Sequence, residues 1–102
     1  MEANTDMIAE QELMKKLLSV LFPKAKIYLF GSRGQGIHRP ESDFDIAIDD
    51  QREIPLEELW QARRVMEAIV PHKIDMVDFN FVPQELKENI ISGSIIWQEK
   101  KE

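Results

Sequence analysis

The sequence predicts an α+β fold in which a small mixed sheet of three or four strands has its helices packed on one face. Two long segments repeat apolar residues at helical spacing, whereas two short segments alternate with the period of a strand. The two periods differ because side chains repeat every 3.6 residues around a helix and every second residue along a strand. The expected order is helix, strand, short helix, strand, helix, strand, helix and an optional last strand.

The first helix is expected to end before Pro23, because proline cannot continue a helix. Asn4, Thr5 or Asp6 can cap its start, since a short side-chain oxygen accepts an unpaired backbone N–H of the first turn. Its apolar stripe consists of Leu13, Met14, Leu17, Leu18 and Leu21.

Residues 26–30, KIYLF, predict a buried strand, because the segment is short, rich in β-branched and aromatic residues, and followed by Gly31. A helical turn is expected to begin near Ser32. Residues 42–49, SDFDIAID, predict a second strand by their period of two. The two faces of this strand carry Phe44, Ile46 and Ile48 on one side and Asp43, Asp45 and Ala47 on the other.

The next helix is expected between Pro55, which suits a first turn, and Pro71, which stops it. Its helically spaced apolar residues are Leu56, Leu59, Trp60, Val65, Met66, Ile69 and Val70.

The last third of the chain predicts a strand, a helix and an edge strand. Residues 73–79, KIDMVDF, alternate again, which places Asp75 and Asp78 on opposite faces of a strand. A short helix is expected over residues 83–91, and residues 94–98 suit an edge strand or an extended segment.

Length and composition indicate one domain, residues 1–102, with a single core. The absence of cysteine excludes disulfides and thiolate metal sites, and no apolar window reaches the roughly 18 to 20 residues that span a membrane. The start MEANTDM lacks the order of a secretory signal, so a soluble, cytoplasmic protein is expected. The net charge of -6 argues against a general nucleic-acid surface and favours a basic protein partner or metal-neutralised anions.

Asp43 and Asp45 are the first candidate site residues. At positions i and i+2 of a strand they project the same way, with Cα atoms about 6.6 Å apart. Two such carboxylates repel each other unless a cation neutralises them, and Mg²⁺ together with nucleotide phosphate oxygens suits that position. A pair of divalent ions can activate an attacking oxygen and stabilise a leaving one in phosphoryl-type transfer.

Gly31, Ser32 and Arg33 are the complementary candidates for phosphate binding. Glycine lets the backbone approach a ligand closely, and the N–H groups at the following helical turn favour phosphate oxygens. Ser32 adds a hydroxyl donor and Arg33 a cation. The intervening loop must then return the chain so that these residues face the aspartates.

Gly31-Ser32, ten further residues and Asp43-Phe44-Asp45 resemble the GSx10DxD signature of the nucleotidyltransferase superfamily related to DNA polymerase β. With its small size and its later KIDMVDF segment, the chain is most similar to the minimal nucleotidyltransferase (MNT, MntA-like) family. Members of that family are often encoded beside HEPN-domain proteins as antitoxins. The resemblance covers residues 27–97, most of the chain.

This resemblance implies transfer of AMP from ATP to an acceptor hydroxyl, with release of pyrophosphate. It also implies that Asp43 and Asp45 hold Mg²⁺, with two ions expected, and that Asp75 is the third carboxylate. Asp75 would complete one metal site and help to deprotonate the acceptor, while Gly31, Ser32 and Arg33 would grip the phosphates.

The resemblance further implies a HEPN ribonuclease toxin as partner, modified on a hydroxyl that is expected to be a tyrosine. An acidic surface suits a basic, RNA-handling partner. Many relatives carry a basic residue where this chain has Gly34-Gln35-Gly36. Two alternatives stay open: an antitoxin that acts by binding alone, and a small-molecule nucleotidyltransferase of the aminoglycoside-modifying kind.

Other polar residues are assigned structural roles. Asp49 and Asp50 are expected in a loop after the second strand, and Asp78 at the surface or as a cap. His38 and His72 have no companions at metal-ligand spacing, so loop or surface positions are expected for both.

Overall fold

The computed structural model describes the backbone of residues 2–101 and the side chains of residues 8–101, and its elements follow the predicted order. They are α1 (Glu2–Leu21), β1 (Lys26–Phe30), α2 (Gly31–Gln35), β2 (Phe44–Asp49), α3 (Leu56–Ile69), β3 (Ile74–Asp78), the 3-10 helix η1 (Phe79–Phe81), α4 (Gln84–Gly93) and β4 (Ile95–Gln98). The optional last strand is therefore present.

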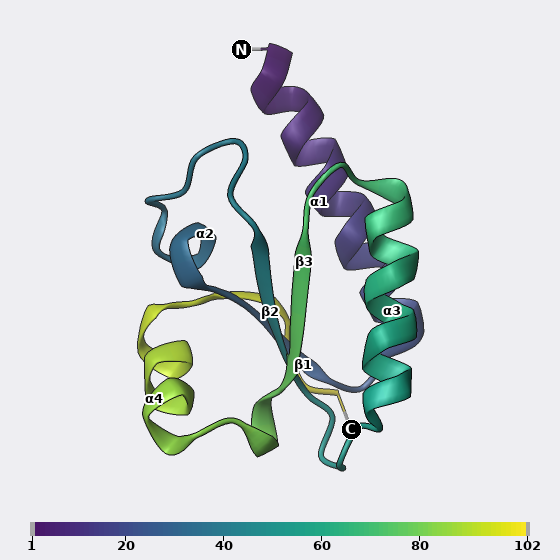
Figure 1. Cartoon of the computed structure of the whole chain (residues 1–102), viewed down its shortest axis with the longest axis vertical. Coiled ribbons are helices and arrows are strands. Elements are labelled where there is room, and N and C mark those ends of the chain that lie inside the picture. The colour runs from purple at the N-terminus through teal and green to yellow at the C-terminus, as the bar shows by residue number, and fades with distance from the viewer. Residues whose placement is uncertain (1, 102) are drawn as a thin grey trace.

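The four strands form one mixed sheet in the order β3-β2-β1-β4. β1 is antiparallel to both β2 and β4, whereas β2 and β3 are parallel. β2 and β3 consequently begin at the same end of the sheet, and β1 ends there. This is the upper end of the sheet in Figure 1, beside α2.

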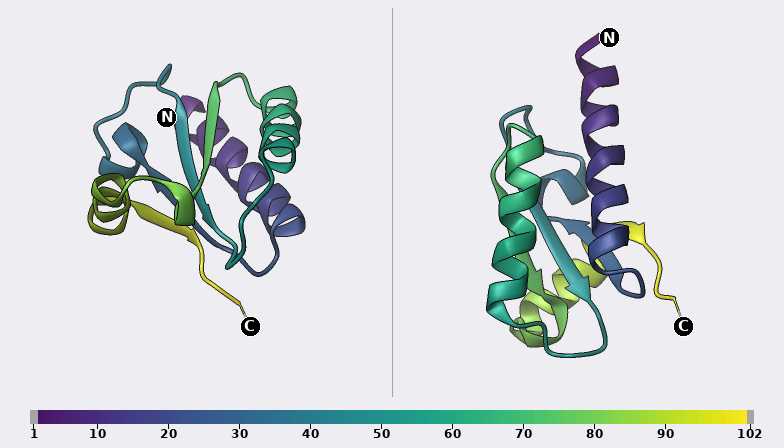
Figure 2. Two further views of the ribbon diagram at one scale, coloured as in Figure 1. Left: turned by 60° about the horizontal axis from the view of Figure 1, so that its bottom comes forward. Right: turned by 90° about the vertical axis from the view of Figure 1, so that its right-hand side faces the viewer.

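Helices cover both faces of the sheet, so the expectation that they pack on one face was wrong. α1 and α3 lie on one side, whereas α2 and α4 lie on the other, as the two views of Figures 1 and 2 agree. The second face is apolar enough to be covered because Tyr28 and Ala47 alternate onto it. They form a small core there with Phe79 and Ile90, and the ring centroids of Tyr28 and Phe79 lie 5.0 Å apart.

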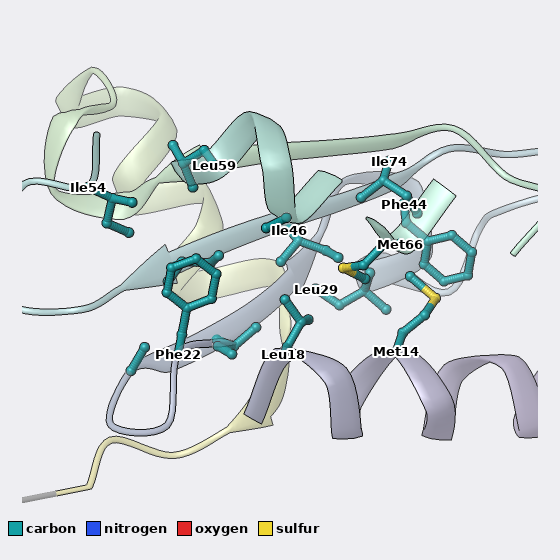
Figure 3. Close-up of a cluster of buried hydrophobic side chains, with 14 of the residues drawn as sticks. Met14, Leu18, Phe22, Leu29, Phe44, Ile46, Ile54, Leu59, Met66 and Ile74 are labelled. Atoms are coloured by element: carbon teal, nitrogen blue, oxygen red, sulfur yellow. The ribbon is translucent and has the colours of Figure 1, made fainter. Parts of the chain in front are cut away.

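The larger core lies between the sheet and the helices α1 and α3 (Figure 3). Phe44 and Ile46 of β2 meet Met14 and Leu18 of α1 and Met66 of α3 there, all nearly or fully buried. Full burial of one such side chain contributes roughly 1.5 to 3 kcal/mol relative to exposure. This core therefore holds β2 rigidly from the face opposite Asp45.

The predicted first helix is confirmed, with two corrections. It begins at Glu2, so Asn4, Thr5 and Asp6 lie inside the helix rather than at its cap. The buried stripe is narrower than predicted, because Leu13 and Leu21 are 48% and 38% exposed. Among residues 2–101, no helix combines the length and the apolar character that crossing a membrane requires.

Candidate active site

The candidate site lies on the α4 side of the sheet, at the end where β2 and β3 begin. Asp45 pairs with Phe30 of β1 on one side and with Asp75 of β3 on the other. Two residues further along, the row Tyr28, Ala47 and Val77 is covered by the second core. Asp45 and Asp75 remain partly exposed because they lie one row beyond that core.

Gly31 follows β1 directly and lies against the carboxylate of Asp45. Its φ is +67°, in the left-handed region that favours glycine. A Cβ atom built on Gly31 would overlap with Oδ2 of Asp45. Two independent reasons therefore favour glycine at position 31: the backbone conformation and the closeness of the Asp45 carboxylate. The sequence-based expectation that the Gly-Ser turn faces the aspartates agrees with this contact.

The charges of Asp43 and Asp75 act on Asp45. Burial raises the pKa of Asp45 above its usual range, and the negative charges of Asp75 and Asp43 raise that pKa further. The positive charge of Lys73 acts in the opposite direction. Negative charge is thus concentrated where β2 and β3 begin, and a cation would relieve the repulsion.

The donor set fits magnesium. Within the described side chains, no three His, Cys, Asp or Glu groups are gathered at metal-binding distance as they stand. However, Asp43, Asp45 and Asp75 are near enough to interact, and carboxylate oxygens are the ligands that Mg²⁺ prefers. Asp43 immediately precedes β2, whereas Asp45 lies within it.

Arg33, which the sequence suggested for phosphate binding, is turned inward against the loop that follows α2. Its side chain is 2% exposed. Nε donates to the carbonyl oxygen of Ser42 at 3.1 Å, and Nη2 donates to the carbonyl oxygens of Pro40 at 3.1 Å and Ser42 at 2.9 Å. The guanidinium carbon lies 3.9 Å from the ring centroid of Phe44.

Arg33 thus contacts both sequence neighbours of Asp43. It donates to the carbonyl oxygen of Ser42 and packs on the ring of Phe44. Burial lowers the pKa of Arg33, and the charges of Glu10 and Asp43 counteract that shift. Arg33 as folded therefore fastens the loop that carries Asp43, while its Nη1 is buried and has no hydrogen-bond partner among the described residues. Sequence patterns cannot reveal such a role, because the carbonyls become partners only once the loop has folded.

The segment Gly34-Gln35-Gly36 completes the turn. Gly36 adopts φ +75° and caps α2, with its N–H donating to the carbonyl oxygen of Arg33 at 3.3 Å. Gln35 is exposed, and Ser32 is partly exposed within α2 beside Gly31. The site consequently brings Gly31, Ser32 and the three aspartates to one end of the sheet.

Asp78 has the capping role expected for it. It is 8% exposed, and its carboxylate accepts from the backbone N–H groups of Ile54 at 2.8 Å and Asn80 at 3.1 Å. Asp49, at the end of β2, accepts from the side-chain amide of Asn80 at 2.9 Å. Both aspartates thus hold the opposite end of the sheet together, away from Asp45.

Two residues near the site were not predicted as part of it. Lys73 is exposed, and its positive charge acts on Asp45. The alternation in KIDMVDF could have indicated it, because that pattern places positions 73 and 75 on the same face of the strand. His72 is partly buried, and its Nε2 lies 2.9 Å from Oε2 of Glu10 and its ring edge faces Phe44. His72 therefore packs behind the site rather than at a free surface.

Comparisons with known proteins find similar chains among nucleotidyltransferases. The family model described as "Polymerase beta, Nucleotidyltransferase" matches residues 12–102. A Haemophilus influenzae protein named "Probable protein adenylyltransferase MntA" is 30% identical over 95 residues, which cover 90% of this chain and 82% of the relative. A Shewanella oneidensis protein named "Protein adenylyltransferase MntA" is 30% identical over 84 residues, 80% of this chain and 60% of that relative.

A solved structure described as a toxin-antitoxin with AMP-PNP shares the fold. Its TM-score is 0.79 at 25% sequence identity, over 89% of this chain and 74% of the other.

Proposed function

The chain belongs to the polymerase beta nucleotidyltransferase family, and on that premise we propose that it transfers AMP from ATP to a hydroxyl group of a protein partner. The partner is a HEPN-type ribonuclease toxin, the acceptor is a tyrosine, and the modification neutralises the toxin. The names of the two curated relatives and the toxin-antitoxin structure with AMP-PNP support this proposal. The cytoplasm, which supplies ATP and Mg²⁺, is the expected compartment.

The pairing of Asp45 with Asp75, with Gly31 against Asp45, is the observation that carries the proposal. Asp43 and Asp45 would hold Mg²⁺, and Asp75 would complete one of two ion sites. Bound Mg²⁺ would neutralise charge on the phosphates and favour ionisation of the acceptor hydroxyl.

The transfer itself is a substitution at the α-phosphorus. The acceptor oxygen forms a bond to this phosphorus, and the bond from the phosphorus to the bridging oxygen of the β-phosphate breaks. Pyrophosphate leaves with that electron pair, and the hydroxyl proton passes to the carboxylate of Asp75. Gly31 and Ser32 border the phosphates, because the missing side chain at Gly31 admits a ligand next to Asp45.

Intact-mass measurement of the partner tests the proposal. Incubation with ATP and Mg²⁺ should add the mass of one AMP, or a whole multiple of it, to the toxin. Asp43→Asn and Asp45→Asn should abolish the addition, whereas Asp49→Asn, a matched change at the other end of β2, should preserve it. An unmodified toxin in the presence of the wild-type chain would refute the proposal.

Neutralisation by binding alone is the second candidate function, and the surface of α3 favours it. Leu56 and Trp60 are 84% and 51% exposed and border a cleft of about 480 Å³, where a protein partner could pack. Under this alternative, Asp45→Asn would still neutralise the toxin at equal expression. Modification of an aminoglycoside by this chain without any partner would instead support the small-molecule alternative.

A further inference from the structure

We propose that Lys73, an exposed cation beside the candidate carboxylates, binds the phosphate chain of the nucleotide. This inference rests on the proposed function and specifies which residue recognises the triphosphate. Neither the sequence signature nor the family comparison assigns a role to this residue.

The backbone places Lys73 at the carboxylates. Its carbonyl oxygen accepts from the N–H of Phe44 at 3.0 Å, and the next pair in the parallel register is Phe44 with Ile74. Continuing that register by one residue sets Lys73 beside Asp43. The period of two along the strand sets it on the same side as Asp75, two residues later.

The other basic residues around the Gly-Ser turn are less suited to phosphate. The guanidinium of Arg33 is buried and already donates to the carbonyls of Pro40 and Ser42. Position 35 carries an uncharged glutamine. His38 and Arg39 are exposed on the loop, but Lys73 is the cation whose charge acts on Asp45.

An ammonium group at position 73 would reduce the electrostatic repulsion between the aspartates and a nucleotide. Three carboxylates and a triphosphate are all anionic, so the nucleotide would be repelled wherever the metal does not offset their charge. Lysine is a compact charge on a flexible stem and commonly contacts phosphate. Lys73 is exposed, and no hydrogen bond or ion pair of its ammonium occurs within the described side chains, so it is available for a ligand.

Calorimetric titration of the purified chain with magnesium AMP-PNP and with magnesium pyrophosphate tests the inference without a partner. Lys73→Gln should weaken both affinities about tenfold, equivalent to about 1.4 kcal/mol. Lys73→Arg should restore most of the affinity, because the charge is kept. Lys24→Gln is the matched control, since Lys24 is another exposed lysine and precedes β1 at the opposite end of the sheet.

Wild-type affinity in Lys73→Gln would overturn the inference, and so would a wild-type chain that binds neither ligand. A lysine that merely offsets the aspartates would give a different pattern, in which Lys73→Gln tightens Mg²⁺ binding and leaves the affinity for magnesium AMP-PNP unchanged. That pattern would also overturn it. Loss of nucleotide binding in Lys73→Gln, combined with a wild-type chain that never modifies the toxin, would refute the proposed function and leave this inference standing.

Discussion

Asp45 and Asp75 are direct partners in the parallel pair of β2 and β3, whereas Asp78, three residues after Asp75, faces the other way and is buried. The carboxylate of Asp78 accepts hydrogen bonds from two backbone N–H groups, whereas Asp75 adds negative charge next to Asp45. One short strand thus carries one aspartate for the site and one for stability.

This division predicts opposite effects for two substitutions on the same strand. Asp75→Asn should reduce AMP transfer by more than about 100-fold, since loss of supporting groups around a metal alone commonly costs 10- to 100-fold. The free energy of unfolding of the Asp75→Asn variant should change little. Asp78→Ala should lower stability by about 1 to 3 kcal/mol, because the N–H of Ile54 is left buried without a partner. Urea unfolding and the transfer assay measure the two effects, and an exchange of the two outcomes would contradict the assignment.

Asp45→Asn is expected to stabilise the metal-free protein at neutral pH while abolishing transfer. The pKa of Asp45 is raised in the folded state by burial, Asp75 and Asp43. Asp45 therefore contributes most to stability at a pH below its pKa in the unfolded chain, about 3.9. That contribution is lost as the pH rises through its higher pKa in the folded state.

Thermal unfolding without metal should accordingly show a higher Tm for Asp45→Asn at pH 7 and a smaller difference at pH 4. A gain of about 1 kcal/mol corresponds to roughly 4 to 8 °C in a small domain. Addition of Mg²⁺ should narrow the difference at pH 7, because the ion stabilises the wild-type carboxylates. A Tm of Asp45→Asn at or below that of the wild type at pH 7 would contradict this prediction.

Gly31→Ala and Gly36→Ala form a matched pair for the contact with Asp45. Both glycines have φ in the left-handed region, so either alanine should cost about 1 to 3 kcal/mol. The space around Gly36 is open, whereas the new Cβ at Gly31 would overlap with the Asp45 carboxylate. Gly31→Ala should therefore reduce transfer about 100-fold by displacing that carboxylate, and Gly36→Ala much less. Equal activity losses in the two variants would argue against the contact.

Arg33→Met tests whether this arginine holds the Asp43 loop. The substitution removes three hydrogen bonds to two carbonyls and the contact with the ring of Phe44, and a loss of about 2 to 4 kcal/mol is expected. Arg39→Met, an exposed change in the same loop, should cost less than about 0.5 kcal/mol. If Arg33 instead served mainly in phosphate binding, Arg33→Met would leave unfolding unchanged and weaken nucleotide affinity.

Much of the fold could be predicted from local patterns. KIYLF at residues 26–30 matches β1 at both ends, and the alternation in SDFDIAID correctly separated Asp45 from the core residues Phe44 and Ile46. Local patterns were less informative about coverage of the sheet, because Tyr28 and Ala47 identify a second apolar face only when β1 and β2 are paired.

The amino-acid sequence alone determined the order of elements, the face of the strand on which Asp45 lies, and the spacing of Asp43 and Asp45 from Gly31-Ser32, because period and turn chemistry are local properties. Tertiary structure decided the rest. The parallel register of β2 and β3 places Asp75 beside Asp45, and folding of the loop turns Arg33 inward while Lys73 stays exposed. These outcomes depend on hydrogen bonds and packing between segments far apart in the chain, which no local pattern encodes.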